Sequence, residues 1–71
     1  MSTKPARLST SERLQRVDQL LSDGREYSTL EIAQLANVCA VNSIIDELRS
    51  NGRDIRCRRE GNLWFYKRWD L

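Results

Sequence analysis

Residues 28–71 read STLEIAQLANVCAVNSIIDELRSNGRDIRCRREGNLWFYKRWDL, and this stretch decides the fold. Ser28 and Glu31 have the spacing of a capping box, in which the hydroxyl and the carboxylate each accept a hydrogen bond from a backbone amide at a helix start. A short apolar helix should therefore begin there. Four apolar residues then recur at helical spacing: Val38, Val41, Ile45 and Leu48. They predict a second helix, from about Cys39 to Ser50, with these four side chains in the core.

Beyond residue 52 the period of the apolar residues changes from that of a helix to that of a strand. Ile55 and Cys57 alternate with arginines, which predicts a strand with one dry face. Residues 60–62 (EGN) supply turn chemistry, and residues 63–66 (LWFY) have the aromatic composition that suits a second strand. The C-terminal part is therefore expected to form a basic β-hairpin.

The apolar pattern of the N-terminal part predicts one more helix. Residues 1–8 show no apolar periodicity and are expected to form a flexible tail. Ser9 and Glu12 fit a capping box, and Gly24 suits a helix end because glycine adopts a left-handed conformation easily. The apolar stripe between them is Leu14, Val17 and Leu21, with Leu20 beside it. Tyr27 is the candidate for a short bridge onto the edge of the hairpin.

Residues 45–55 (IDELRSNGRDI) resemble a known family. In the compact winged-helix domains of small phage and prophage proteins, a Leu-Arg pair ends the recognition helix and Gly-x-Asp-Ile opens the wing. The amino-terminal domain of the biotin repressor has a similar run. The resemblance extends over residues 10–71. It implies an α+β winged helix-turn-helix fold at residues 9–71, with three helices and a C-terminal β-hairpin wing.

The chain departs from the family in the turn between the two helices. Asn37 stands where a glycine is usual, and Val38 precedes Val41 by only three positions. This spacing predicts a tighter turn and an unusual approach of the second helix to a groove.

Length and composition exclude several classes of protein. A chain of 71 residues can hold one small core, and no run of 18 apolar residues indicates a membrane span. We expect a cytoplasmic protein of a bacterium or a phage-infected cell. Cys39 and Cys57 are expected to be reduced thiols in or near the core. Histidine is absent, and there is no Gly-rich phosphate loop, so the sequence predicts no catalytic residue, no metal, no cofactor and no enzyme.

Charge is distributed unevenly along the chain. Residues 1–48 carry five Lys/Arg against seven Asp/Glu, whereas residues 49–71 carry seven against three. Positive charge on the hairpin favours double-stranded DNA as the partner and a role as a sequence-specific transcriptional regulator. The candidate DNA-binding residues are Ser28, Thr29, Asn42, Ser43, Arg49, Arg56, Arg58, Arg59 and Lys67.

These candidates have different expected roles. The hairpin cations would hold phosphates: these are Arg56, Arg58, Arg59 and Lys67, together with Arg68. The helix start at Ser28 and Thr29 offers backbone amides and hydroxyls to another phosphate. Asn42 is expected to read adenine, and Ser43 suits either a donor or an acceptor on a base edge. Carboxylates such as Asp18 and Glu31 are treated as ordinary surface charges.

Other interpretations of the same residues stay open. The basic residues would also protect an exposed strand edge from pairing, and Asn42 and Ser43 would also suit a solvated helix face. Asp46 would either accept a hydrogen bond from cytosine or repel phosphate. The alternative function is a module that binds a host transcription or replication protein, favoured by the acidic pair Asp46 and Glu47 and by the aromatic residues of the last strand. At least one ring there must be exposed, which also suggests a homodimer.

Overall fold

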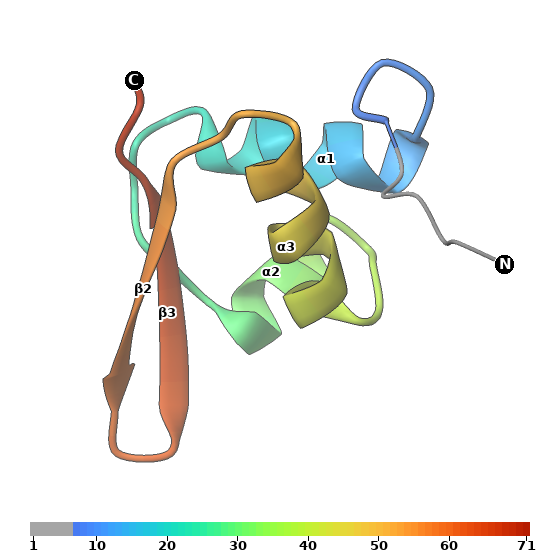
Figure 1. Cartoon of the computed structure of the whole chain (residues 1–71). Coiled ribbons are helices and arrows are strands. Elements are labelled where there is room, and N and C mark those ends of the chain that lie inside the picture. Colours follow the sequence, from blue (N-terminus) through green and yellow to red (C-terminus); the bar gives the residue numbers. More distant parts are fainter. Residues whose placement is uncertain (1–6) are drawn as a thin grey trace, which may run out of the picture.

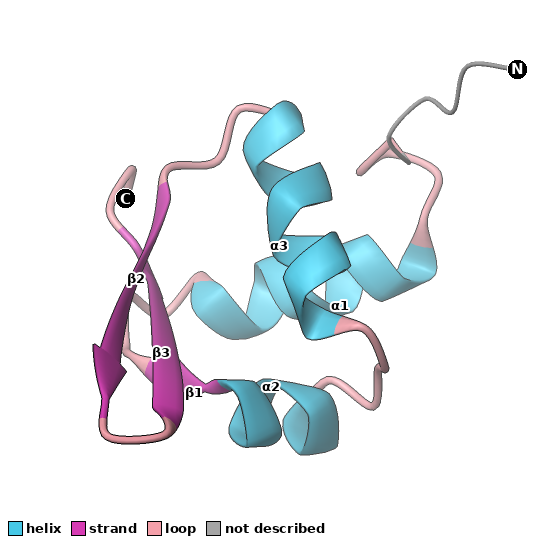
Figure 2. Cartoon of the chain, turned by 60° about the horizontal axis from the view of Figure 1, so that its bottom comes forward, coloured by secondary structure: helices cyan, strands magenta, loops and turns pink. Residues whose placement is uncertain are grey.

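The chain folds into three helices and a three-stranded antiparallel sheet, as a computed structural model that describes residues 7–71 shows (Figure 1). The elements in chain order are α1 (Glu12–Leu21), β1 (Tyr27–Ser28), α2 (Thr29–Leu35), α3 (Val41–Ser50), β2 (Ile55–Glu60) and β3 (Leu63–Arg68). The helices gather on one side of the β2–β3 hairpin, whose turn projects beyond them (Figures 1 and 2). This is a small α+β domain with a layout compatible with a winged helix.

The sheet joins the hairpin to the helices through one short bridge. The strand order is β1-β3-β2, and Tyr27 pairs with Tyr66 while Ser28 pairs with Phe65. The predicted bridge at Tyr27 is thus confirmed. In the hairpin, the turn has Gly61 at a φ of 61°, a left-handed conformation that favours glycine. The predicted hairpin is therefore present, with Glu60 opposite Leu63 at its tip.

Helix α1 begins later than the sequence predicts. The cap is Ser11, whose Oγ accepts a hydrogen bond from the Leu14 amide at 3.4 Å, and the predicted capping box of Ser9 and Glu12 does not form. Residues 8–10 form a turn instead, in which the amide of Thr10 donates to the Arg7 carbonyl at 3.1 Å. The helix ends as predicted, with Gly24 at a φ of 75°.

The connection between α2 and α3 also differs from the prediction. Residues 36–40 link the two helices, and Asn37 and Ala40 both have left-handed backbones, with φ values of 53° and 51°. Because Ala40 leaves the helical region, α3 starts at Val41 rather than near Cys39. The prediction of a tight turn is therefore wrong: the link from residue 36 to residue 40 includes two residues with left-handed backbone conformations.

The core lies between the helices and the sheet. Its buried side chains are Leu14, Val17, Leu21, Ile32, Ala36, Val41, Ile44, Ile45, Leu48, Ile55 and Tyr66. The predicted stripes of α1 and α3 are confirmed, except that Val38 is only half-buried and Ile44 joins the core. Leu30 and Leu35, which belong to the apolar run of α2, are each 63% exposed.

The two thiols do not lie in the core. Cys39 and Cys57 are both free and exposed, so the prediction that they lie in or near the core is wrong. Cys39 lies in the segment that connects α2 to α3, and its side chain is exposed there. The strand face that carries Cys57 is dry only at Ile55, because β2 extends past the helices toward the hairpin turn.

The described residues begin inside the segment that the sequence predicts to be a tail. Residues 1–6 of that prediction lie outside the described part. Leu8 packs partly against the core, and its amide donates to Asn51 Oδ1 at 3.1 Å. Within residues 7–71, no helix combines the length and apolar character needed to cross a membrane, and no cluster of three potential metal ligands occurs.

Candidate nucleic-acid interface

Helix α3 and the hairpin border two hollows that share two residues. The first hollow has a volume of about 390 Å³ and lies between α3 and the sheet face that carries Cys57 and Tyr66. The second, about 420 Å³, lies between α2 and the hairpin turn. Asn42 and Trp64 line both. The exposed side of α3, the start of α2 and the tip of the hairpin therefore meet in one region.

Asn42 lies at the centre of this region and is held by the sheet. Its side chain is exposed on the first turn of α3, and its Oδ1 accepts a hydrogen bond from the Tyr66 hydroxyl at 2.7 Å. The Tyr66 ring is buried, so this contact joins an exposed amide to the core. Ser43 is exposed beside it. The structure thus brings the two predicted base readers together at the start of α3.

The start of α2 is largely satisfied by its own capping box. Ser28 Oγ accepts from the Glu31 amide at 3.1 Å, and the Ser28 amide donates to Glu31 Oε1 at 2.9 Å. The predicted box is confirmed, and Glu31 is a capping group rather than an ordinary surface charge. Thr29 is partly exposed and lines the second hollow. Of the two predicted phosphate contacts, Thr29 is the more accessible, because Ser28 is buried.

Arg58 is neutralised within the domain. Its guanidinium contacts Glu26 Oε1 at 2.6 Å and Glu60 Oε2 at 2.8 Å, and it lies 4.6 Å from the centre of the Phe65 ring. The hydrogen bonds from Arg58 hold the pKa of Glu26 below its usual value, and the two carboxylates raise the pKa of Arg58. Two carboxylates around one guanidinium leave little net positive charge for a phosphate.

Arg56 and Lys67 flank one exposed indole on the outer face of the hairpin. Arg56 lies 5.0 Å and the Lys67 ammonium 4.8 Å from the centre of the Trp69 ring. Arg56 is also paired with Asp54 at 3.2 Å, whereas Lys67 has no carboxylate of the described residues within ion-pair distance. Arg56 and Arg58 share this face, as predicted, because their partners across the hairpin are Lys67 and Phe65.

Arg59 is the arginine of the hairpin with no carboxylate partner within residues 7–71. It lies on the opposite face from Arg58, across from Trp64, with its guanidinium carbon 5.9 Å from the centre of that ring. Its Nε donates to the Gly61 carbonyl at 2.9 Å, which orders the side chain at the turn. Arg59 therefore lies opposite a residue that lines both hollows.

Arg49 joins α3 to the start of the hairpin. Its Nε donates to the Ile55 carbonyl at 2.9 Å, and its Nη1 contacts Asp46 Oδ1 at 3.2 Å. Both residues line the first hollow, and the Asp46 side chain is 76% exposed. An exposed carboxylate therefore lies beside this predicted DNA-binding arginine.

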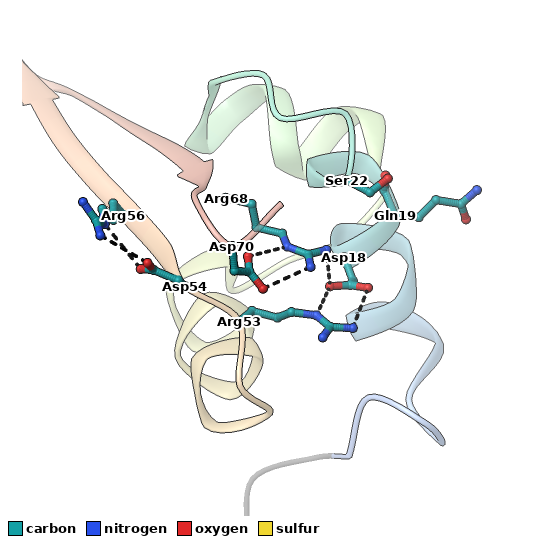
Figure 3. A network of polar contacts seen from close by, with 8 residues as sticks. All are labelled: Asp18, Gln19, Ser22, Arg53, Asp54, Arg56, Arg68 and Asp70. Atoms are coloured by element: carbon teal, nitrogen blue, oxygen red, sulfur yellow. Dashed lines mark hydrogen bonds and ion pairs between the residues drawn. The ribbon is translucent and has the colours of Figure 1, made fainter.

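Arg68 belongs to a separate network at the far end of the hairpin (Figure 3). Its Nη1 contacts Asp18 Oδ1 at 3.2 Å and its Nε contacts Asp70 Oδ1 at 2.9 Å, while Arg53 contacts Asp18 at 2.7 Å. The Arg68 side chain is only 9% exposed. It is therefore not available as a phosphate anchor, and Asp18 is not an ordinary surface charge; both predictions are wrong.

Sequence patterns did not identify Tyr66 or Trp64 as members of the site. Alternation along β3 places both on one face, but it does not reveal that the Tyr66 hydroxyl meets Asn42. Leu30 and Leu63 line the second hollow and are 63% and 55% exposed. The sequence did not single out Leu30 as exposed, because α2 is apolar along nearly its whole length and shows no clear polar face.

The ion pairs of the sheet predict a loss of stability in acid. Hydrogen bonds from Arg58 lower the pKa of Glu26, and hydrogen bonds from Arg68 lower the pKa of Asp70. A carboxyl whose pKa is lower in the folded state contributes stability above its unfolded pKa and loses it as the pH falls through the folded value. The urea midpoint should therefore fall as the pH drops below about 4.5, the ordinary value for Glu.

Glu26→Gln isolates one part of this acid effect. The variant should have a lower urea midpoint than the parent at pH 7, and the difference should shrink toward pH 3 as Glu26 of the parent becomes protonated. A difference that stays constant between pH 7 and pH 3 would assign the effect of the substitution to packing rather than to charge.

Comparison with protein-family models, curated proteins and solved structures gave no significant match.

Proposed function

We propose that this protein is a winged helix-turn-helix protein that binds double-stranded DNA in a sequence-specific way, in the manner of a phage or bacterial transcriptional regulator. One observation carries the proposal: Asn42, at the exposed start of α3, borders the same two hollows as Trp64, whose strand partner Arg59 has no carboxylate partner among the described residues. Ser43 is exposed next to Asn42. A helix with short polar side chains near a strand that carries an arginine without an ion-pair partner suits a major groove and its flanking phosphates.

Helix α3 and the hairpin are expected to make different contributions to DNA binding. Helix α3 offers hydrogen-bonding groups, but its exposed side also carries Asp46 and it therefore adds little electrostatic attraction. Arg59 and Lys67 are the hairpin cations that form no ion pair with a carboxylate of residues 7–71, although the charge of Lys67 also acts on Glu26. Affinity for the phosphate backbone should therefore come mainly from the hairpin, and discrimination between bases from α3.

Arg59→Ala tests this division. Fluorescence polarisation with a labelled random duplex, measured over a range of salt concentrations, should show binding by the parent that weakens steeply with salt. The variant should bind about three- to tenfold more weakly at low salt, and the slope of log Kd against log salt should fall by about one.

Arg25→Ala is the control, because it removes the same charge from a guanidinium that forms no ion pair among the described residues, and the amide of residue 25, which donates to Asp23 Oδ1 at 2.8 Å, is kept in the variant. It follows Gly24, which lies near Leu71 and so at the opposite end of the hairpin from the turn. Binding should stay within about twofold of the parent. Equal losses in the two variants would show that only net charge matters, and an absence of binding by the parent at low salt would overturn the proposed function.

A second function, binding of a host protein, is favoured by the apolar surface around the second hollow. Leu30, Leu63 and Trp64 are all exposed there, at 63%, 55% and 45%. Exposed apolar side chains grouped around a hollow are typical of protein interaction sites. If the parent binds no duplex, Leu30→Ser and Leu63→Ser should abolish capture of a partner from host lysate, and sedimentation at two concentrations would show whether that partner is a second copy of the chain.

A further inference from the structure

Asn42 has an orientation that Tyr66 determines. The Tyr66 hydroxyl donates to Asn42 Oδ1 at 2.7 Å, and the buried Tyr66 ring keeps that hydroxyl in place. An amide has a carbonyl that accepts and an NH2 group that donates. The Tyr66 hydroxyl takes one of the two lone pairs of the Asn42 carbonyl and orients the amide, whose NH2 group has no partner in this contact and can donate to a molecule that approaches α3.

The surroundings of this donor are apolar on one side. Asn42 lines the second hollow together with Leu30, Ala33, Leu63 and Trp64. The lining also includes the hydroxyl of Thr29 and the side-chain amide of Asn62, and it has no charged side chain. A group that fills this hollow beside the amide therefore combines a hydrogen-bond acceptor with a small apolar part.

Among the four bases, thymine has this combination in the major groove. Its O4 accepts a hydrogen bond, and its C5 methyl group lies beside O4. Guanine offers two acceptors and adenine an acceptor and a donor, both without an apolar group, and cytosine offers a donor. A donor beside an apolar hollow therefore favours thymine over the other three bases.

We infer that α3 reads thymine: the Asn42 NH2 group donates to O4, the methyl group lies against the apolar residues of the second hollow, and Tyr66 is the positioning residue that orients the amide. This inference rests on the proposed function, because it assumes that α3 enters a major groove. It adds the identity of the preferred base and gives Tyr66 a role that is distinct from packing.

Selection of bound duplexes from a randomised pool, followed by competition measurements on the selected site, tests the inference. The parent should select a site with thymine at a fixed position and prefer it by about tenfold over the other bases. Replacing that thymine by deoxyuridine, which lacks the methyl group, should weaken binding by about fourfold, the factor expected for one buried methyl group.

Tyr66→Phe tests the positioning role. The variant keeps the ring but not the hydroxyl, so Asn42 is free to turn, and the preference for thymine should fall to about threefold or less. The affinity of the variant for random duplex should stay near that of the parent. Because an unfolded variant would lose this affinity, the measurement separates loss of orientation from loss of folding. Tyr27→Phe is the matched control: Tyr27 pairs with Tyr66 across the sheet, but its hydroxyl contacts Asp23, and its preference should stay at the parent value.

The outcomes separate the inference from the proposed function. Selection of a site with no position at which thymine is preferred, no effect of deoxyuridine, or an unchanged preference in Tyr66→Phe would overturn the inference and leave DNA binding intact. No binding of the parent to any duplex at low salt would overturn both. Selection of thymine that is lost in Tyr66→Phe but not in Tyr27→Phe would support both.

Discussion

Leu48→Ala should lower the free energy of unfolding by about 3 kcal/mol, a typical cost for removing a large apolar side chain from a core. Leu48 lies in α3 and has no exposed surface. A domain of this size is stable by only roughly 4–11 kcal/mol, so the variant should lose a large part of its stability. Urea denaturation followed by circular dichroism should show the change in the midpoint.

Leu35→Ala is the control for Leu48→Ala. It makes the same substitution at the end of α2, where the side chain is 63% exposed, and its cost should stay within about 0.5 kcal/mol. Both residues are helical, so intrinsic helix propensity affects the two variants equally. Similar losses in the two variants would contradict the position of the core between α1, α3 and the sheet.

Asp18→Asn should lower the free energy of unfolding by about 2 kcal/mol, because it removes the carboxylate that Arg53 and Arg68 share. The Asp18 side chain is 19% exposed and that of Arg68 is 9% exposed, so neither charge is fully hydrated (Figure 3). The cost is smaller than that of breaking a fully buried pair because Arg68 keeps its contact with Asp70. This substitution should loosen the attachment of the last strand to α1.

Asp46→Asn is the matched control for the network. Asp46 also pairs with one arginine, Arg49, at 3.2 Å, but its side chain is 76% exposed. A pair of this kind contributes little, and its loss should change the free energy of unfolding by less than about 0.5 kcal/mol. Equal effects of the two substitutions in thermal unfolding would refute the special role given to Asp18.

The parts of the fold that depend on local patterns were predictable from the sequence. The capping box of Ser28 and Glu31, the apolar stripe of α1 and the hairpin around Gly61 all follow from spacings of a few residues. The start of α3 was not, because it depends on the left-handed backbone of Ala40, and alanine gives no local signal for that conformation.

The site was less predictable than the fold because its electrostatics depend on residues that are far apart in the sequence. Counting charges placed five cations on the hairpin, but Glu26 neutralises Arg58 from 32 positions away, and Asp18 holds Arg68 from 50 positions away. Periodicity assigns a face to each side chain, but only the tertiary fold shows which carboxylate lies beside it.

If α3 and the hairpin form one surface for double-stranded DNA, a titration of the 15N-labelled protein with a short random duplex at low salt should show it. The amide signals of residues 40–46, and of Arg59 and Trp64 on the hairpin, should shift or broaden, while those of α1 stay in place. Shifts confined to the outer face around Trp69, or no shifts at all, would contradict this shared surface.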